Sequence, residues 1–416
     1  MKKQDTNQID TGRLQVVVNT GSPIRPIENA LVRISYTGNP TETIEEVRTD
    51  ANGQSPVLEL PAPPLEYSMA PNENQPYSEY TIQVNAPGYA PIDVSGSELL
   101  PTALSIQPIR LSLETPSDPF ADIVIPAHTL YGNYPEKIPE AEIKPTDESG
   151  EIVLSRVVIP EYVIVHDGAP SDSTAQDYYV RYRDYIKNVA SSEIYATWPD
   201  ATIRANVLAI MSFTLNRVYT EWYRNKGYDF TITSSTAFDH KWIQGRNIFD
   251  SISAIVDEIF SNYLSRPNVR QPILTQYCDG RRVSCPNWMQ QWGSKALGDQ
   301  GLNTIQILRN YYGQDLYINT AEEISGVPAS WPGYDLTIGS SGAKVRQLQE
   351  QLNTIAEVYT AIPSIPVNGT YDESTQQAVS SFQSVFGLPQ SGIVDYPTWY
   401  KVQEIYVGIT RIAELS

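Results

Sequence analysis

One carboxylate in this sequence has unusual neighbours. Glu193 lies in the stretch SSEIYATWP (191–199), among small, apolar and aromatic residues and six residues before Pro199. A carboxyl group placed by apolar neighbours keeps its proton at higher pH and can act as a general acid. The competing interpretation is an acid at a helix N-terminus, where the helix dipole favours it, because Pro199 is suited to begin a helix.

Length, composition and charge limit the classes of protein to consider. The chain has 416 residues, of which 41% are hydrophobic and 19% charged, which is typical of a globular protein with two to four domains. The net charge is −19, and residues 157–334, with 15 basic and 18 acidic residues, are the least acidic segment. We therefore expect no nucleic-acid partner, and we find no stretch apolar enough for membrane insertion. The start, MKKQDTNQID, lacks the apolar core of a signal peptide.

Residues 1–114 are predicted to form an all-β sandwich domain. The stretches GRLQVVV and ALVRISYTG have the alternating, β-branched pattern of strands, and TDANGQ offers a tight turn between strands. Together with VNAPGYAP, they resemble the transthyretin-like, carboxypeptidase-regulatory family. The resemblance implies a structural or chaperone-like appendage, and no residue in this segment indicates chemistry.

Residues 115–156 are rich in proline and acidic residues. Proline fixes φ and removes a backbone donor, so we predict an extended linker or pro-segment rather than a regular core element. Arg156, followed by Val157, is predicted as a processing site at a domain edge. An ordinary strand that enters the next domain is the alternative for this position.

Residues 335–416 are predicted to form a small domain of three helices. Apolar residues recur at helical spacing at Val345, Leu348, Leu352 and Ile355. Asp372 and Asp395 are suited to cap the next two helices. The stretches LTIGSSGAKVRQLQEQL, VNGTYDESTQQAVSSFQ and GLPQSGIVDYPTW resemble the three-helix peptidoglycan-binding domain. The resemblance implies a ligand in the wall glycan or its stem peptide.

The middle segment, 157–334, alternates helical and strand patterns and is predicted to be an α+β domain. We expect a long amphipathic helix over 201–225, a strand over 228–236, and further helices over 248–264 and 302–313. The candidate acid would precede the first of these helices.

The stretch 185–218 resembles the stage II sporulation protein D family of lytic transglycosylases. That family has a Glu, a Pro six residues later and a Lys eleven residues after the Glu; this chain has Glu193, Pro199 and Arg204 at those offsets. The family's Met-x-Gln-aromatic-Gly signature is matched by WMQQWG, in which Gln291 is the glutamine.

This resemblance implies that Glu193 is the catalytic acid of a reaction without external water. The C6 hydroxyl of muramic acid would attack its own anomeric carbon and form a 1,6-anhydro ring. An intramolecular nucleophile has a high effective molarity, so one carboxyl can replace the two of ordinary glycoside hydrolysis. Arg204 is expected to contact carboxylates of the glycan or to hold the acid, and Tyr277 and Gln291 are weaker candidates for substrate binding.

The order of the segments resembles the clostridial-type spore cortex-lytic enzymes, which cleave the MurNAc–GlcNAc bond of cortex peptidoglycan during germination. These are precursors held in the dormant spore and activated by a germination protease. The resemblance implies cleavage between Arg156 and Val157. It also implies a location in the cortex or coat region of the spore, after deposition from the mother cell.

Two departures from the family are visible. Met211 stands where the family often has an Arg eighteen residues after the Glu. Some relatives hold a metal with a His and two Cys, whereas the matching stretch here has His240 without a cysteine. For Cys278 and Cys285 we expect a disulfide or two free thiols rather than zinc. No cofactor or metal is expected.

Two alternatives stay open at this point. The chain could be a catalytically inactive peptidoglycan-binding protein of the spore or cell wall, which Met211 would fit. It could also be an engulfment-type wall remodeller, although the pro-segment and the missing membrane anchor argue against that.

Overall fold

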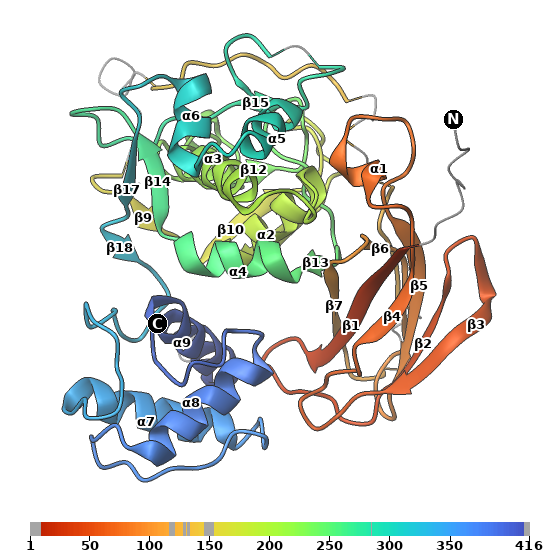
Figure 1. Ribbon diagram of the computed structural model, residues 1–416, viewed down its shortest axis with the longest axis vertical. Helices are drawn as coiled ribbons and strands as arrows, with labels where there is room; N and C mark the ends of the chain where they lie inside the picture. Colours follow the sequence, from red (N-terminus) through yellow and green to blue (C-terminus); the bar gives the residue numbers. More distant parts are fainter. Residues whose placement is uncertain are drawn as a thin grey trace.

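The computed structural model describes residues 10–115, 121–127, 130, 134–144, 154–283 and 285–411. Figure 1 shows three parts: β-sheets at the N-terminal end, a mixed middle part, and a group of helices at the C-terminal end. Two apolar clusters underlie them. One belongs to the N-terminal sheets, and the other runs through the middle and C-terminal parts.

The N-terminal part contains two sheets that share one apolar cluster. Its elements are β1 (Asp10–Thr20), β2 (Leu31–Tyr36), β3 (Asn39–Arg48), β4 (Leu58–Ala62), α1 (Glu66–Met69), β5 (Ser78–Asn85), β6 (Ile92–Leu99), β7 (Leu104–Leu111) and β8 (Ala121–Val124). The strand orders are β13-β7-β1-β4 and β3-β2-β5-β6-β8. The strands expected from the alternating stretches are confirmed, and the alternating residues of β1 are buried in the shared cluster.

The middle part is built around helices. Its elements are β9 (Val158–Ile159), β10 (Tyr162–His166), β11 (Asp177–Arg181), α2 (Tyr182–Glu193), α3 (Asp200–Tyr219), the 3-10 turn Arg224–Lys226, β12 (Ile232–Thr233), β13 (Ile248–Phe249), α4 (Asp250–Ile259), β14 (Asn262–Ser265), β15 (Tyr277–Cys278), β16 (Met289–Gln290), α5 (Gln291–Asp299), α6 (Thr304–Tyr312), β17 (Tyr317–Thr320) and β18 (Glu323–Ile324). The expected helices over 248–264 and 302–313 are present as α4 and α6. The expected strand over 228–236 is reduced to β12, because the rest of that stretch follows turns and loops.

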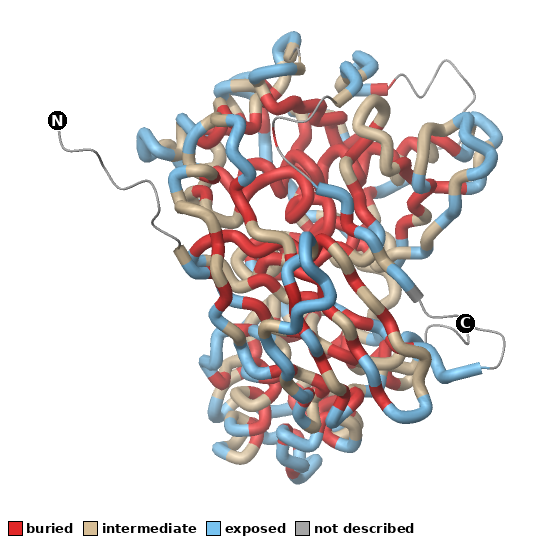
Figure 2. Tube along the Cα trace, turned by 90° about the vertical axis from the view of Figure 1, so that its right-hand side faces the viewer, coloured by how far each residue is buried: buried red, intermediate tan, exposed pale blue. Residues whose placement is uncertain are grey.

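The long helix α3 is not amphipathic, contrary to the prediction from its sequence. Thr202, Ile203 and nearly every residue from 205 to 217 are buried. The helix lies at the centre of the middle part, with α2, α4, α5 and α6 packed around it. Its polar side chains therefore bond inside the protein; Ser212, for example, donates a hydrogen bond to the Ile273 carbonyl. Figure 2 shows the buried residues, in red, gathered in the interior of the protein.

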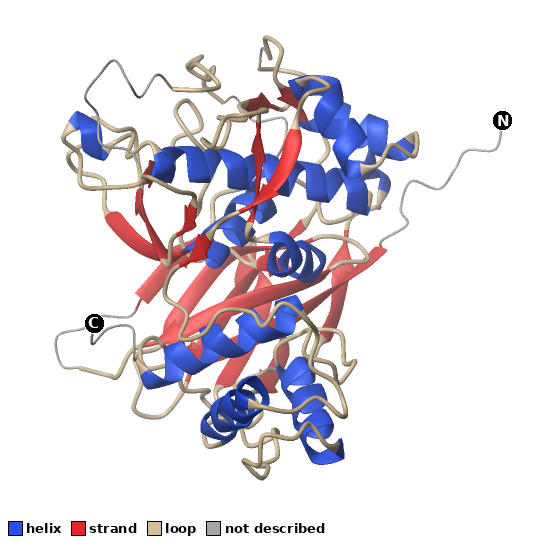
Figure 3. Ribbon diagram, turned by 90° about the vertical axis from the view of Figure 1, so that its left-hand side faces the viewer, coloured by secondary structure: helices blue, strands red, loops and turns tan. Residues whose placement is uncertain are grey.

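The C-terminal part contains α7 (Ala343–Ala356), α8 (Glu373–Val385) and α9 (Tyr396–Thr410). The expected apolar face of α7 is buried, and Asp372 and Asp395 cap α8 and α9 by accepting hydrogen bonds from Thr375 and Thr398 backbone N–H groups. The expected three helices are confirmed, and Figure 3 shows them below the helices of the middle part, with the large sheets behind.

The N-terminal sheets are completed by the middle part. Strand β13 pairs antiparallel with β7 at the edge of the four-stranded sheet. Beside this edge, Arg246 forms a buried ion pair with Glu98 at 2.7 Å, and Asn247 donates to the Glu98 carbonyl and to the Ser105 hydroxyl. A buried ion pair depends on both partners, so this contact joins the two parts firmly.

The C-terminal helices contact both other parts. Arg183 and Lys187 of α2 converge on Asp257 of α4, and Arg183 also pairs with Glu404 of α9. On the other side, the Ile24 N–H donates to the Gly408 carbonyl at 2.9 Å, close to the end of α9. The three parts thus touch one another pairwise.

Within the described ranges, no helix combines the length and the apolar character that crossing a bilayer needs.

Candidate active site

Glu193 is the last residue of α2, so it does not lie at a helix N-terminus. The backbone becomes extended at Ile194, and a short connection leads to Pro199, the N-cap of α3. Tyr195 and Trp198 in this connection are buried and pack in an aromatic cluster with Trp292. The apolar residues around the acid therefore hold the end of α2 against α5. The helix-dipole interpretation does not apply, because a helix C-terminus is unfavourable for a negative charge.

The Glu193 side chain is 7% exposed and receives hydrogen bonds from neutral donors. Its Oε1 accepts from the Lys241 backbone N–H at 2.7 Å, and its Oε2 accepts from Gln291 Nε2 at 3.1 Å. Burial raises the pKa of this carboxyl, although Lys137, the Lys241 N–H, Tyr277 and Gln291 each act to lower the pKa. The outcome is an acid that retains its proton to a higher pH than an exposed glutamate.

A cavity of about 50 Å³ opens beside Glu193. The residues that line it are Leu130, Tyr134, Pro135, Lys137, Glu193, Thr236, Lys241, Tyr277, Cys278, Asp279, Val283 and Gln291. A buried water needs roughly 10–15 Å³ of such space, so the cavity holds a few waters rather than a sugar ring. It nevertheless brings an acid, a lysine, a tyrosine and an amide to one place.

Two of the predicted site residues, Tyr277 and Gln291, line this cavity and come from adjacent segments of the fold. Tyr277 lies in β15, which pairs in parallel with β16, and Gln291 follows β16 directly as the first residue of α5. Tyr277 is fully buried beside Glu193 and acts to lower the pKa of its carboxyl, although no hydrogen bond of ordinary geometry joins the two side chains. Gln291 also donates to the Glu193 carbonyl at 3.0 Å. The structure thus brings three of the four residues predicted for catalysis and substrate binding together.

A disulfide between Cys278 and Cys285 closes the loop next to these strands, which confirms one of the two states expected for the cysteines. Asp279 organises the loop because its carboxylate accepts from three backbone N–H groups, those of Arg281, Arg282 and Val283. The disulfide therefore fixes one wall of the cavity.

Lys137 is a site residue that the sequence did not reveal. It comes from the proline-rich segment, and its Nζ donates to the Asp239 carbonyl at 2.6 Å and lies 4.7 Å from the centre of the Tyr277 ring. Burial lowers the pKa of Lys137, while the charge of Glu193 acts in the opposite direction. The two side chains are therefore close enough to influence each other's ionisation.

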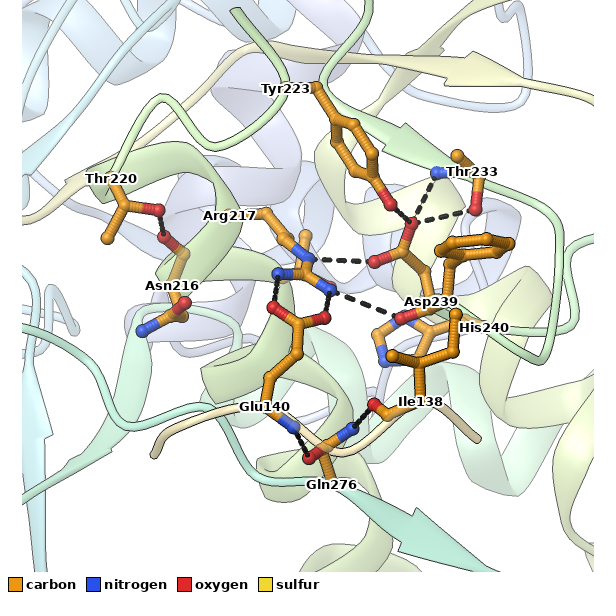
Figure 4. Close-up of polar contacts among 12 residues, drawn as sticks. Ile138, Glu140, Asn216, Arg217, Thr220, Tyr223, Thr233, Asp239, His240 and Gln276 are labelled. Carbon is orange, nitrogen blue, oxygen red and sulfur yellow. Dashed lines mark hydrogen bonds and ion pairs between the residues drawn. The ribbon is translucent and has the colours of Figure 1, made fainter. Parts of the chain in front are cut away.

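Residues 134–144, which we call the strap, cross the surface of the middle part without helix or strand. Glu140 in the strap accepts two hydrogen bonds from Arg217, at 2.6 and 2.9 Å, and Arg217 Nε donates to Asp239 at 2.7 Å (Figure 4). Burial acts against ionisation of Glu140, yet the Arg217 and Lys144 charges lower its pKa to about 2. The strap is thus fixed by an ionised pair beside the cavity.

Arg204 does not reach the cavity, so the expectation that it holds Glu193 is wrong, while a contact with the glycan stays a prediction. Its guanidinium pairs with Asp200 at 2.6 Å and with Glu258 at 2.6 Å, on a face of α3 away from the lining residues. The cation beside Glu193 is instead Lys137. Met211, at the position where the family often has an Arg, is fully buried in the core.

The predicted processing site has two unlike residues. Arg156 is exposed and pairs with Glu323 at 2.7 Å, whereas Val157 is 1% exposed and directly precedes β9. A protease needs an extended, accessible segment, so cleavage at this bond requires local unfolding of the start of β9. Cleavage here stays a prediction.

His240 lies behind the cavity and is fully buried. Its Nδ1 is 3.0 Å from the Tyr185 hydroxyl, and its ring stacks on Tyr277. Burial holds the pKa of His240 well below its ordinary value, so the ring is neutral. Among the residues that the structure describes, no group of three or more His, Cys, Asp or Glu side chains could hold a metal ion.

Comparison with protein families matches residues 341–402 to the peptidoglycan binding domain family. The match spans all of α7 and α8 and about the first half of α9. The chain therefore contains a peptidoglycan-binding domain within a larger multidomain protein of mixed α/β structure. Peptidoglycan is supported as its partner.

Comparison with solved structures finds partial similarities. The N-terminal domain of SleB is similar at 26% identity over 18% of this chain and 99% of that chain, with a TM-score of 0.17. The minor pilin GBS52 of Streptococcus agalactiae is similar at 13% identity over 27% and 48%, with a TM-score of 0.19. A catechol 1,2-dioxygenase of Acinetobacter radioresistens is similar at 16% identity over 28% and 56%, with a TM-score of 0.19. Comparison with curated protein sequences finds no match.

Proposed function

We propose that this chain is a lytic transglycosylase that cleaves the MurNAc–GlcNAc bond of spore cortex peptidoglycan during germination. The observation that carries the proposal is Glu193, a buried carboxyl with a raised pKa at a cavity, in a chain that also contains a peptidoglycan-binding domain. The helical part would hold the wall polymer, and the middle part would cut it.

In the proposed reaction one carboxyl acts twice. Protonated Glu193 gives its proton to the glycosidic oxygen as the bond from C1 of muramic acid breaks. The C6 hydroxyl then attacks C1 and returns its proton to the Glu193 carboxylate, which leaves a 1,6-anhydro end and an unchanged enzyme. No second carboxylate is needed, because the nucleophile belongs to the substrate.

The neighbours of Glu193 support this use of the acid. Its hydrogen-bond donors are an amide N–H from Lys241 and the side chain of Gln291, which orient the carboxyl without an arginine partner that would keep it ionised. Tyr277 is placed to interact with the same carboxyl and with a substrate hydroxyl beside it.

Location and processing belong to the same proposal. We infer a place in the spore cortex or coat region, deposition from the mother cell, and activation by a germination protease near Arg156. The N-terminal sheets would form a β-sandwich appendage of the transthyretin-like kind. The sequence resemblance supports these points, and N-terminal sequencing of the protein from germinating spores tests the processing site.

The decisive experiment is mass spectrometry of the fragments released from purified cortex by the chain, both intact and after processing. Anhydro-muramic ends are the expected product. Reducing ends would instead indicate a hydrolase, because water rather than the C6 hydroxyl would then have attacked C1.

Two observations favour a second candidate, a wall-binding protein without catalytic activity. The cavity beside Glu193 has room for a few waters only, and the family match covers the helical part alone. Such a protein would sediment with sacculi and release no soluble fragments, whereas the proposed enzyme would sediment with sacculi and also release soluble fragments.

A further inference from the structure

We infer that Lys137 is a positioning residue for Glu193, and that the strap which carries Lys137 is a permanent part of the catalytic unit. The inference rests on the proposed function only in treating Glu193 as catalytic. The inference goes beyond the proposed function because it adds a residue and a segment from outside the predicted catalytic domain. Both lie on the N-terminal side of the proposed processing site.

The position of Lys137 is fixed by contacts on two sides. Its Nζ donates to the Asp239 carbonyl at 2.6 Å, and its charge lies over the Tyr277 ring at 4.7 Å. Lys137, Tyr277 and Glu193 all line the same cavity. Within the described part of this cavity wall, Lys137 is the lysine whose charge acts on Glu193.

The strap cannot move away from this place without breaking charged contacts. Arg217, whose side chain is 0% exposed, is shared between Glu140 of the strap and Asp239 of the middle part (Figure 4). Further along, Arg266 donates to both oxygens of Glu142 at 2.6 and 2.7 Å.

Backbone groups add to these ion pairs. Gln276 accepts from the Glu140 N–H and donates to the Ile138 carbonyl. The Leu274 N–H donates to the Glu142 carbonyl at 2.8 Å, and Gln271 bonds both to the N–H and to the carbonyl of Lys144. The strap is therefore held along its length by the middle part, independently of any covalent link through residues 145–156.

Other ionisable groups also surround Glu193, and the test has to separate them from Lys137. They are Tyr185 of α2, Lys241 of the loop before β13, Tyr277 of β15 and Asp279 after β15. Asp239, Arg217 and His240 lie behind Lys137. Substitution of Lys137 alone leaves all of these groups in place.

The first test is an NMR titration of the Glu193 carboxyl in the full chain carrying ¹³C-labelled glutamate, with Glu193→Gln used for assignment. Loss of the neighbouring positive charge in Lys137→Met is expected to move the Glu193 midpoint to higher pH by about one unit. Lys137→Arg should keep the midpoint of the parent chain. Lys226→Met, at an exposed lysine of the middle part, is the matched control and should also leave it unchanged.

A reciprocal measurement covers the case in which Lys137→Met does not fold. Because coupling between two sites acts equally in both directions, Glu193→Gln should lower the pKa of Lys137, followed by ¹³C-labelled lysine. An unchanged Lys137 titration in Glu193→Gln, or an unchanged Glu193 titration in folded Lys137→Met, overturns the inference. Neither measurement uses a glycan, so the proposed function can fail while this inference stands, or the reverse.

The permanence of the strap has its own test. A protease site is inserted into residues 145–153 of the full chain, the chain is cut there, and the Glu193 titration is repeated. The midpoint of the uncut chain is expected after cleavage, because the strap stays in place. A shift to the midpoint of Lys137→Met would mean that the strap has left, and would overturn this part of the inference.

Discussion

Two glutamates near the cavity, Glu193 and Glu140, are both largely buried, yet their ionisation is pushed in opposite directions. Glu140 faces the Arg217 fork and Lys144, and its pKa falls to about 2 although burial opposes this. Glu193 receives neutral hydrogen-bond donors and one lysine charge, and burial prevails, so its pKa rises. Burial alone therefore does not decide the state of a carboxyl; a bidentate guanidinium does.

The comparison separates Glu140, an acid that holds the structure, from Glu193, the acid that we propose to be catalytic. Glu140 is paired with an arginine, which keeps it ionised so that it can hold the strap. Glu193 is bonded to neutral donors, which orient the carboxyl and allow it to exchange a proton. The predictions below test this division, starting with the largest expected effect.

Glu193→Gln should reduce the release of anhydro-muropeptides by about 10²–10⁴-fold, the range for loss of a general acid. Glutamine keeps the size of the side chain and can still accept from the Lys241 N–H, but its amide nitrogen cannot accept from Gln291 and has no acidic proton to give. Thermal unfolding should show a protein at least as stable as the parent, because a buried carboxyl without an arginine partner is removed. Activity equal to that of the parent chain would exclude the proposed role.

Arg217→Met should lower the free energy of unfolding by about 3–5 kcal/mol, because it removes the buried cation shared by the carboxylates of Glu140 and Asp239 and leaves Glu140 with Lys144 alone. Urea denaturation measures this. The matched control is Arg204→Met, which removes two ion pairs with the exposed partners Asp200 and Glu258 and should change stability by less than about 1 kcal/mol. Similar losses of stability in both variants would contradict the conclusion that the buried ion pairs of Arg217 hold the strap more strongly than surface ion pairs would.

The two glutamates should also respond to pH in opposite ways. A lowered pKa stabilises the fold above about pH 4.5, and this contribution is lost as the pH falls toward 2, so Glu140→Gln should be less stable than the parent by about 2 kcal/mol at pH 6 and by little at pH 2. A raised pKa has the reverse sign: the parent loses stability as the pH rises above 4.5, and Glu193→Gln should remove that loss. Urea unfolding between pH 2 and 7 measures both, and parallel curves for the two variants would refute the comparison.

Replacing Cys278 and Cys285 by serine should lower the free energy of unfolding by only about 2 kcal/mol, because the closed loop is short. The disulfide holds one wall of the cavity, so its removal should broaden the titration curve of Glu193 or shift its midpoint by more than the change in the free energy of unfolding alone would suggest. The same measurement on the parent chain under reducing conditions is the control, and it should match the double variant.

The regular elements could be predicted well from the sequence because their signals are local. Capping by Asp372 and Asp395, the apolar face of α7 and the alternation in β1 each depend on neighbouring residues only. The exception is α3, whose polar residues suggested an exposed face. Its side chains find partners inside the protein, and such partners come from distant segments that no local pattern reveals.

The site was predicted in part for the same reason. Glu193 and Gln291 belong to stretches that carry a family pattern, Tyr277 was a weaker candidate, and the structure brings the three together. Arg204 matched a family offset, but Asp200 and Glu258 engage it elsewhere. Lys137 could not be found, because a lysine in a proline-rich segment gives no sign of the cavity more than fifty residues away along the chain.

The pairwise contacts among the three parts have a mechanical consequence. The helices of the peptidoglycan-binding domain are tied to both other parts, because α9 is joined to α2 through Arg183, which also contacts α4, and to the N-terminal part through Gly408. If Glu193 cleaves the polymer as proposed, these contacts hold the binding helices and the site of cleavage at a fixed spacing. A polymer gripped at one end would meet the carboxyl at a set reach, so the lengths of the pieces would be dictated by the protein's own dimensions rather than by chance encounter.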